Sequence, residues 1–226
     1  MWHTNEKTAL EMAIGAALHP EGRALVAMKH VGLNVAADAF KSVAVTGITG
    51  SVVLVVCDDP GMHSSQNEFD SRRYAVETAT VVLEASDSQE AYDLTREAVR
   101  ISHQIHSLVM LRMTTRVCHA NSQVRRSEPA PGVTAITPLM HRPSQYVVAP
   151  AFSRPNVQRL FDSELPRRIK LAEAFAGNRI SGPDHARYGI IVTGVTRHYL
   201  ADVLDGDAAR ILALTMPFPL PVKTPA

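Results

Sequence analysis

The run Ser51-Val-Val-Leu-Val-Val-Cys57 constrains the fold of this chain more than any other segment. It is β-branched and continuously apolar, and Asp58-Asp-Pro-Gly61 stops it. A strand this apolar fits a sheet that is covered on both faces, as parallel sheets are. Helical and strand-like patterns alternate around it through the first half of the chain. This alternation predicts an α/β fold with a doubly wound, mostly parallel sheet.

Periodicity and capping residues place the other elements. Asn5 or Thr4 can cap the first helix, and Gly47 can end the second. In the first half we expect helices over 6–18, 34–45, 68–78 and 88–105, and strands over 24–28, 51–57, 81–84 and 108–113. In the second half we expect a helix over 156–176 that Pro166 kinks, strands over 188–193 and 211–216, and a helix over 196–204.

Prolines divide the chain into two units, because proline fixes φ and removes a backbone donor. Residues 1–120 form the first α/β unit, 121–150 a proline-rich linker, and 151–226 the start of a second α/β unit. The chain ends on a proline-rich tail with no further helix to cover the second sheet. We therefore expect the second unit to be incomplete. Residues 120–180 carry more Lys and Arg than Asp and Glu. We interpret this local excess of positive charge as a solvated face or a subunit contact rather than a nucleic-acid site.

Composition excludes several classes of protein. The 226 residues carry 23 Lys and Arg against 22 Asp and Glu, a formal net charge of +1, which argues against a polybasic nucleic-acid binder. No apolar run approaches the roughly 20 residues that span a bilayer, so we expect no membrane contact. Two cysteines are too few for a disulfide framework or an iron–sulfur ligand set. With no secretory signal evident, we expect a cytoplasmic protein.

Common catalytic motifs are missing or weak. There is no Gly-x-Gly-x-x-Gly, P-loop or Gly-x-Ser-x-Gly pattern, and Gly206-Asp207 reads as a loop. His103 and His106 could share a metal, but surface histidines are the better interpretation because no third ligand follows. Cys118 beside His119 is interpreted as a packed thiol rather than a nucleophile with its base.

Three segments are denser in polar groups than their surroundings explain: Thr4–Lys7, Met28–Asn34 and Asp58–Glu68, the last running on to Arg72. The second and third directly follow predicted strands. In open parallel sheets ligands bind beyond the carboxyl ends of the strands, so both segments point to one shared crevice. Each could also be no more than a turn, since Asp-Pro-Gly is a good turn sequence by itself.

Extended to Thr4–Ala16, Met28–Asp38 and Asp58–Glu68 and followed by Leu111–Val117, these segments closely resemble, in the same order, the alpha subunit of indolepyruvate:ferredoxin oxidoreductase. That family consists of thiamine-diphosphate 2-oxoacid:ferredoxin oxidoreductases. The resemblance implies a pyrimidine-binding domain that lacks its first strand, followed by an incomplete domain like the transketolase C-terminal domain. It further implies that the chain is a fragment of such a subunit.

The resemblance also implies roles for particular residues. Glu6 matches the catalytic glutamate that hydrogen-bonds the cofactor's pyrimidine ring and favours its imino tautomer. Arg72 matches an arginine near the substrate carboxylate, where bidentate hydrogen bonds would orient the oxoacid. His30 and Asn34 are expected on the cofactor side and His63 on the substrate side. Hydrogen bonds that merely shape the loops are equally compatible with those three residues.

Beyond these five residues, Arg112 and Arg116 could face a partner subunit. The cofactor expected is thiamine diphosphate with Mg, held jointly with a domain outside this chain, and iron–sulfur clusters belong to other parts of the enzyme. The expected partners are a beta subunit, the remaining alpha-subunit domains, ferredoxin, CoA and an arylpyruvate.

Three functions remain open. The first is a component of an enzyme that oxidatively decarboxylates a 2-oxoacid to an acyl-CoA. The second is a non-catalytic remnant or assembly module of the same family, and the third is an unrelated ligand-binding domain. In either family case we expect the isolated chain to have weak or no activity. Exposed sheet edges should make it oligomeric or poorly soluble.

Overall fold

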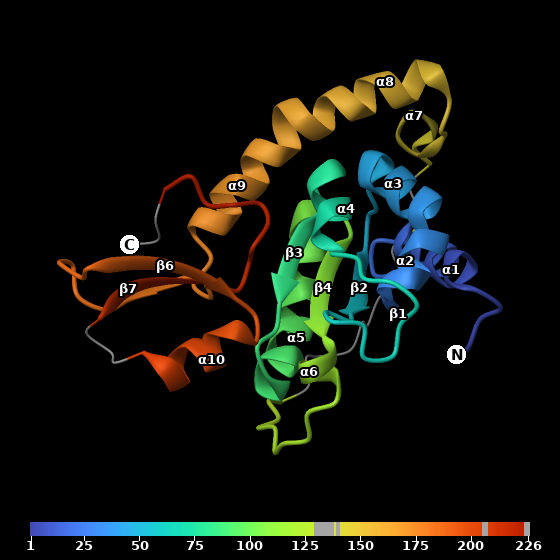
Figure 1. Cartoon of the computed structure of the whole chain (residues 1–226). Helices are drawn as coiled ribbons and strands as arrows, with labels where there is room; N and C mark the ends of the chain where they lie inside the picture. The colour runs from blue at the N-terminus through green and yellow to red at the C-terminus, as the bar shows by residue number, and fades with distance from the viewer. Residues whose placement is uncertain (129–137, 139–140, 205–207, 224–226) are drawn as a thin grey trace.

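The protein has two sheets joined by a long helical rod, as the computed structural model shows (Figure 1). The structure describes residues 1–128, 138, 141–204 and 208–223. Gly206-Asp207 and most of the proline-rich stretch between 129 and 140 lie outside those ranges. Within them, no helix combines the length and the hydropathy that crossing a bilayer requires.

The first sheet confirms the predicted parallel α/β architecture. Its four strands lie in the order β1-β2-β4-β3, and all three pairings are parallel. In the register, Leu54 lies between Val26 and Met110. Each strand matches a predicted one, with ends that differ by no more than one residue: β1 Arg23–Lys29, β2 Ser51–Asp58, β3 Val81–Glu84 and β4 Val109–Thr114.

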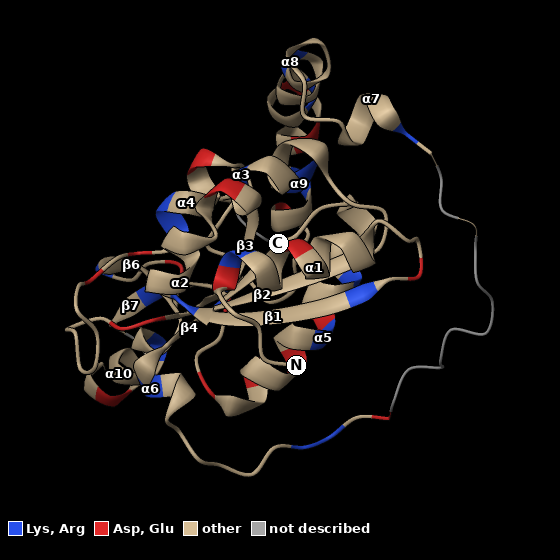
Figure 2. Cartoon of the chain, turned by 90° about the vertical axis from the view of Figure 1, so that its right-hand side faces the viewer, with Lys and Arg blue, Asp and Glu red and all other residues tan. Residues whose placement is uncertain are grey.

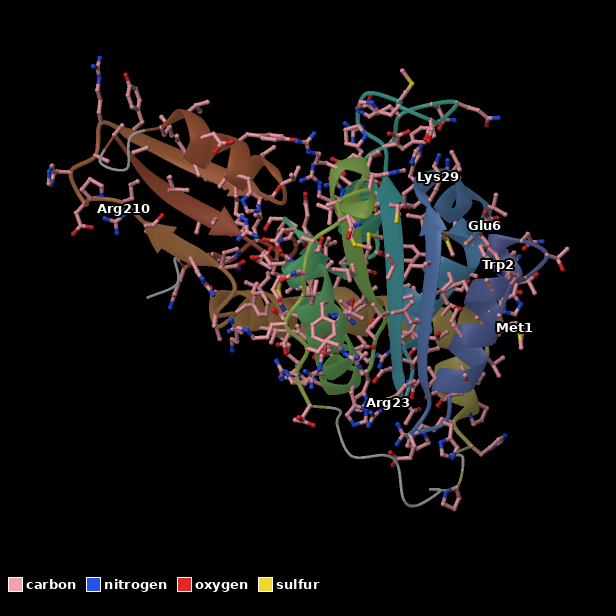
Figure 3. The ribbon with its side chains drawn as sticks, turned by 90° about the horizontal axis from the view of Figure 1, so that it is seen from below. Met1, Trp2, Glu6, Arg23, Lys29 and Arg210 are labelled. Carbon is pink, nitrogen blue, oxygen red and sulfur yellow. The ribbon has the colours of Figure 1, made fainter. Side chains whose placement is uncertain are left out.

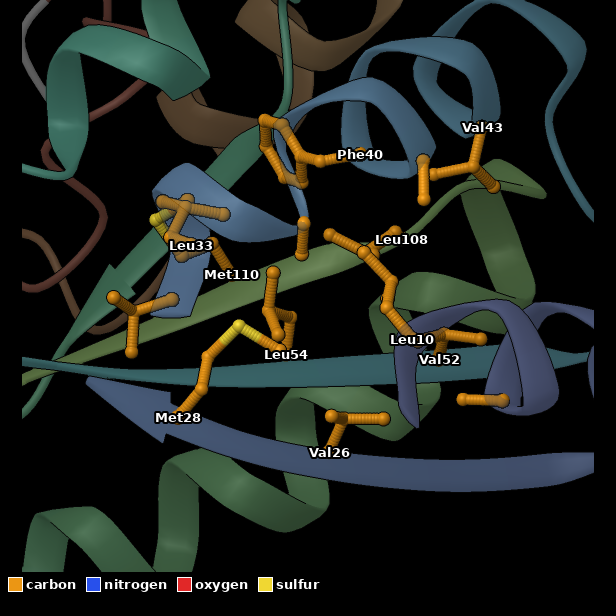
Figure 4. Close-up of a cluster of buried hydrophobic side chains, with 14 of the residues drawn as sticks. Leu10, Val26, Met28, Leu33, Phe40, Val43, Val52, Leu54, Leu108 and Met110 are labelled. Atoms are coloured by element: carbon orange, nitrogen blue, oxygen red, sulfur yellow. The ribbon is translucent and has the colours of Figure 1, made fainter. Parts of the chain in front are cut away.

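Helices cover both faces of this sheet, which is why β2 is apolar throughout. Val52, Leu54 and Val56 point into one hydrophobic cluster (Figure 4), whereas Val53 and Val55 point into the other. α5, Ser88–Ile105, packs on the second cluster. The first cluster is covered by α1 Glu6–Ala17, α2 His30–Val35, α3 Ala37–Thr46 and α4 Arg72–Glu77.

Three helices depart from the prediction. α2 begins at His30, directly after β1, where a polar loop was expected, and the fully buried Ala36 separates it from α3. α3 ends at Gly47 as predicted, with φ at +71°, a value that suits glycine. α4 begins at Arg72 rather than at residue 68, because the preceding Ser71 is held by Asp58 through its backbone N–H and its hydroxyl.

A helical rod links the two sheets. It consists of α8 Pro150–Arg159, a π-helical turn η1 over Leu160–Glu164 and α9 Leu165–Glu173, and the short α7 Pro143–Tyr146 precedes it. The expected helix over 156–176, kinked at Pro166, is therefore corrected. Pro166 lies in the first turn of α9, and the wider π turn before it accommodates the missing N–H and the ring.

Two arginines dock this rod on the first unit. Arg159 Nη2 donates to Val45 O at 3.0 Å and Arg168 Nη1 to Ala79 O at 2.8 Å, so each satisfies a carbonyl near the end of α3 or α4. Burial lowers the pKa of Arg168 to about 10. Part of the basic excess noted over 120–180 thus holds helices together within the chain (Figure 2).

The second sheet has the order β5-β7-β6 and adjoins the first. Its elements are β5 Arg179–Ser181, β6 Tyr188–Thr193, α10 Thr196–Val203 and β7 Ala209–Leu214. The antiparallel β5 was not predicted, and β7 ends two residues earlier than expected.

The segment after β7 returns to the first sheet. Glu84 N donates to Thr215 O and Val82 N to Phe218 O, each at 2.8 Å, so residues 215–218 cover the outer edge of β3. We had expected residues 215 and 216 to end the strand over 211–216 and the residues after them to form a proline-rich tail. The opposite edge differs, because β1 pairs only with β2 in the described part of the chain.

Two buried serines near the end of α5 allow a matched test of packing. Ser102 Oγ accepts from Val52 N at 2.9 Å and donates to Ser107 O at 2.7 Å, whereas Ser107 Oγ has no partner among the described residues. We expect Ser102→Ala to destabilise the protein by about 1–3 kcal/mol, because a buried N–H loses its acceptor. Ser107→Ala should change stability by less than about 0.5 kcal/mol. Urea denaturation measures both, and equal losses would contradict the assignment.

Candidate functional site

The carboxyl edge of the first sheet has the geometry of a ligand crevice. β2 is followed by α4, which packs on one face of the sheet through Ala75. β4, its neighbour, is followed by α6, Thr115–Cys118, which packs on the other face through Val117. Adjacent strands whose following helices diverge in this way open a crevice between them, where open α/β sheets bind ligands.

A buried cluster of charges forms the floor of this crevice. Arg112 on β4 is 5% exposed, and its Nε donates to Asp58 Oδ2 on β2 at 2.6 Å. Its Nη1 donates to Glu84 Oε1 on β3, also at 2.6 Å. One guanidinium therefore joins three neighbouring strands. We had expected that Arg112 could face a partner subunit. This expectation is wrong, because Arg112 is buried and both of its carboxylate partners lie inside the chain.

Arg72, at the start of α4, extends this cluster toward the second sheet. Its guanidinium bonds Asp70 in two places, with Nη2 at 2.7 Å from Oδ2 and Nε at 2.9 Å from Oδ1. Nη1 lies 3.4 Å from Glu84 Oε2 and 3.3 Å from Thr193 Oγ1. Hydrogen bonding to Asp70 raises the pKa of Arg72, so the side chain stays cationic. Its charge is already matched within the chain.

Gly194 lets the second sheet approach this cluster closely. It follows β6 with φ at +54°, and a Cβ at this position would overlap Glu84 Oε1. The carboxylate of Glu84 thus accepts hydrogen bonds from Arg72 and Arg112 and also contacts the backbone of the second unit at Gly194. The close approach requires glycine for two reasons, its backbone conformation and its lack of a side chain.

The loop over residues 59–71 is shaped by Asp59. Its carboxylate accepts hydrogen bonds from Ser64 N at 2.9 Å, His63 N at 3.2 Å, Ser65 Oγ at 2.7 Å and Thr115 Oγ1 at 2.7 Å. These bonds, that of Ser64 most of all, hold the pKa of Asp59 well below its usual range. Asp59 therefore acts as the internal support of the loop.

A cavity of about 880 Å³ lies over this edge, between the two sheets. Arg72 and His63, both predicted for the substrate, contribute to its wall. Thr114 Oγ1 is buried and has no hydrogen-bond partner in the described ranges, and no carboxylate there pairs with Arg116. The remaining wall residues are Pro60, Glu84, Arg112, Thr115, His119, Ala120, Thr193, Val195, Thr196 and Tyr199.

Glu6 lies beside β1, outside this cavity. Asn5 caps α1 by accepting from Thr8 N at 2.9 Å, which places Glu6 in the first turn. The Glu6 side chain packs against α2, since a Cβ on Gly32 would come within 2.6 Å of Glu6 Cγ. It also lines a groove of about 580 Å³ along β1, and Figure 3 shows it near Lys29 at the carboxyl end of that strand.

His30 and Asn34 lie on α2, next to Glu6. His30 is 1% exposed, its Nε2 lies 3.0 Å from Asn67 O, and its Nδ1 has no partner among the described residues. Asn34 Oδ1 accepts from Tyr74 Oη at 2.6 Å. The two polar segments meet as predicted, because Asn67 belongs to the 59–71 loop. The five candidate residues nevertheless do not line one crevice: Arg72 and His63 line the cavity between the sheets, Glu6 lines the groove along β1, and His30 and Asn34 line neither.

The histidine pair singled out in the sequence forms no metal site within the described ranges. The rings of His103 and His106 lie 6.1 Å apart, and no metal-binding group of three or more ligands is found in the described ranges. Sequence reasoning missed Glu84 and the true place of Arg112. A signal existed for both, since charged residues inside or ending an apolar strand are almost always paired.

Comparison with known proteins identifies relatives along nearly the whole chain. The protein named indolepyruvate oxidoreductase subunit IorA in Pyrococcus abyssi is 40% identical over 230 residues, which is 97% of this chain and 35% of that protein. Its namesake in Methanothermobacter thermautotrophicus is 36% identical, over 95% of this chain and 35% of that protein. The resemblance to the indolepyruvate oxidoreductase alpha subunit is confirmed.

The chain spans about a third of the length of these IorA relatives. No family model matches it. Among solved structures, the 2-oxoglutarate:ferredoxin oxidoreductase of Magnetococcus marinus superposes with a TM-score of 0.67 at 13% identity, covering 98% of this chain and 46% of that one. This likeness confirms the fold predicted from the sequence.

We expect Arg112→Met to destabilise the protein by about 3–5 kcal/mol, because Asp58 and Glu84 would remain buried without their cation. Arg116→Met removes the same group from an exposed position and should cost less than about 0.5 kcal/mol. Chemical denaturation of the two variants tests this. A loss below 1 kcal/mol for Arg112→Met would show that water reaches the cluster.

Asp59 should make stability depend on pH. Because its folded pKa is depressed, its contribution is complete above the unfolded value of about 4 and declines as pH falls below it. Asp59→Asn should therefore be less stable than the unmodified chain at pH 7, and the difference should shrink toward pH 3. Denaturation at a series of pH values gives this difference. A gap that stays constant would mean that Asp59 is not the titrating group.

Proposed function

We propose that this chain contributes the pyrimidine-facing part of a thiamine-diphosphate site in an indolepyruvate-type 2-oxoacid:ferredoxin oxidoreductase. The reaction is the oxidative decarboxylation of an arylpyruvate to an acyl-CoA. The 35–40% identity to IorA subunits supports the family, and one structural observation carries the site. Glu6 is held at the carboxyl end of the sheet, against a glycine, with no hydrogen-bond partner for its carboxylate in the described part of the chain.

The residues around Glu6 fit a polar heterocycle. Gly32 leaves room for the Glu6 side chain, and the first turn of α1 favours an acidic residue through the helix dipole. His30 adds a buried ring nitrogen that lacks a partner. When bound, thiamine diphosphate supplies the nucleophilic carbon and the electron sink that decarboxylation of a 2-oxoacid needs. The role of Glu6 would be to share a proton in a hydrogen bond between its carboxylate and the pyrimidine ring nitrogen.

The cavity between the two sheets is the proposed substrate side. Arg72 orients the carboxylate of the oxoacid, and Asp70 and Glu84 hold its guanidinium in place. Because Arg72 is already paired, we add Arg116 as the cation that balances the charge of the substrate. His63 and Tyr199 supply the wall that an aromatic side chain would contact.

The rest of the enzyme is assigned to other polypeptides or to further parts of a longer protein. This assignment is supported by the length of the IorA relatives, of which the chain spans about a third. A beta subunit and the remaining alpha-subunit domains would hold the diphosphate with Mg and the iron–sulfur clusters. Ferredoxin would accept the electrons and CoA the acyl group.

A second function is favoured by a different observation. The charges of Arg72 and Arg112 are matched internally by Asp58, Asp70 and Glu84, which a ligand-free structural role explains equally well. The chain would then be a non-catalytic remnant or assembly module that keeps the fold of the family and performs no chemistry. The two functions differ in whether Glu6 matters.

The test compares Glu6→Gln with Glu11→Gln, a control on the same helix whose carboxylate lies near Lys7. The chain is purified from its host with the polypeptides that accompany it. Thiamine diphosphate with Mg²⁺ is titrated calorimetrically, and arylpyruvate-dependent reduction of ferredoxin is followed. Glu6→Gln should lower the rate by about 100-fold or more, whereas Glu11→Gln should stay within about twofold. Equal rates for Glu6→Gln and the unmodified chain would favour the assembly module.

A further inference from the structure

The two cysteines of the chain meet at the carboxyl edge of the first sheet. Cys57 is the next-to-last residue of β2, and Cys118 is the last residue of α6. β2 pairs with β4 so that Cys57 lies beside Met113, and α6 begins directly after β4 and contacts β2. The two side chains, although far apart in the sequence, thus come from contacting elements and interact electrostatically.

The two thiols are not equivalent. Cys118 is exposed, whereas Cys57 is partly buried. Hydrogen bonding to Cys118, followed by burial, raises the pKa of Cys57, and the same hydrogen bond lowers the pKa of Cys118. Cys118 is therefore the thiol that ionises more easily and that a reagent in solution can reach. Both properties mark the attacking thiol of a dithiol pair.

We propose that Cys57 and Cys118 form a redox-active pair that closes to an intrachain disulfide on meeting a low-molecular-weight disulfide. The Cys118 thiolate attacks one sulfur of that disulfide and releases the first thiol. Cys57 then gives up its proton and attacks the Cys118 sulfur, releasing the second thiol. The pair loses two electrons and two protons, and the reagent gains both.

The disulfide would act on the wall of the cavity. α6 carries Thr115 and Arg116, which line the cavity, and Thr115 Oγ1 also donates to Asp59 Oδ1. A covalent link from Cys118 to the end of β2 therefore fixes the position of these two groups. The proposal does not depend on thiamine chemistry, because it needs only the two thiols and an oxidant of the stated class.

The experiment treats the native chain with oxidised glutathione and then blocks and counts the remaining thiols. We expect the count to fall from two to none, with a mass loss of two hydrogens and one cross-linked peptide that joins Cys57 and Cys118. Dithiothreitol should restore both thiols. No bound glutathione and no covalent dimer should remain, because the second thiol lies within reach of the first.

Two single variants serve as controls. Cys57→Ser should stop at a mixed disulfide, with one glutathione on Cys118, because the resolving thiol is missing. Cys118→Ser should react at least about tenfold more slowly, since Cys57 is shielded and keeps its proton. A stable glutathione adduct on the unmodified chain, or a covalent dimer in place of the intrachain link, would overturn the proposal. So would an unreactive native chain under conditions that modify Cys57→Ser.

Discussion

The carboxyl edge of the first sheet depends on one buried cation. Arg112 bonds Asp58 on β2 and Glu84 on β3 from its own place on β4, so the ends of three strands are fixed relative to one another. A buried ion pair is costly unless its geometry is good and its other hydrogen bonds are made. Both conditions hold here, because Asp58 also binds Ser71 and Glu84 also binds Arg72. Asp58 of this cluster binds Ser71 at the end of the 59–71 loop, and Glu84 contacts the second sheet at Gly194.

The cavity between the sheets lies at that edge, a second hollow runs along β1, and the 59–71 loop has hydrogen bonds toward both sides. On one side Glu6 packs against α2, and on the other Arg72 lines the cavity between the sheets. His30 reaches Asn67 of the loop and Thr115 reaches Asp59, so a change on one side has a structural route to the other. This arrangement suits a cofactor and a substrate that meet at one point, which is what the proposed function requires.

Local patterns were sufficient to predict most of the sheet and insufficient for the contacts that build the site. The run from Ser51 to Cys57 fitted a strand covered on both faces, and the alternation of helical and strand-like patterns around it predicted a parallel sheet. His30–Val35 looked like a polar loop, but it forms a helix, and the side chain of Glu6 packs against it at Gly32. The return of residues 215–218 to β3 is a long-range pairing that no short window contains. Of the site residues implied by the resemblance, Arg72 and His63 line the cavity between the sheets and Glu6 the groove along β1, a division that needed coordinates.

Amide hydrogen exchange with and without thiamine diphosphate and Mg²⁺ tests the central claim most directly, on the chain together with the polypeptides that purify with it. The account predicts that exchange slows in α2 and in the 59–71 loop, on either side of the carboxyl edge. Exchange in β5, at the far edge of the second sheet, should not change. Unchanged exchange in both α2 and the loop, or slowing confined to the amino ends of the strands, would contradict it.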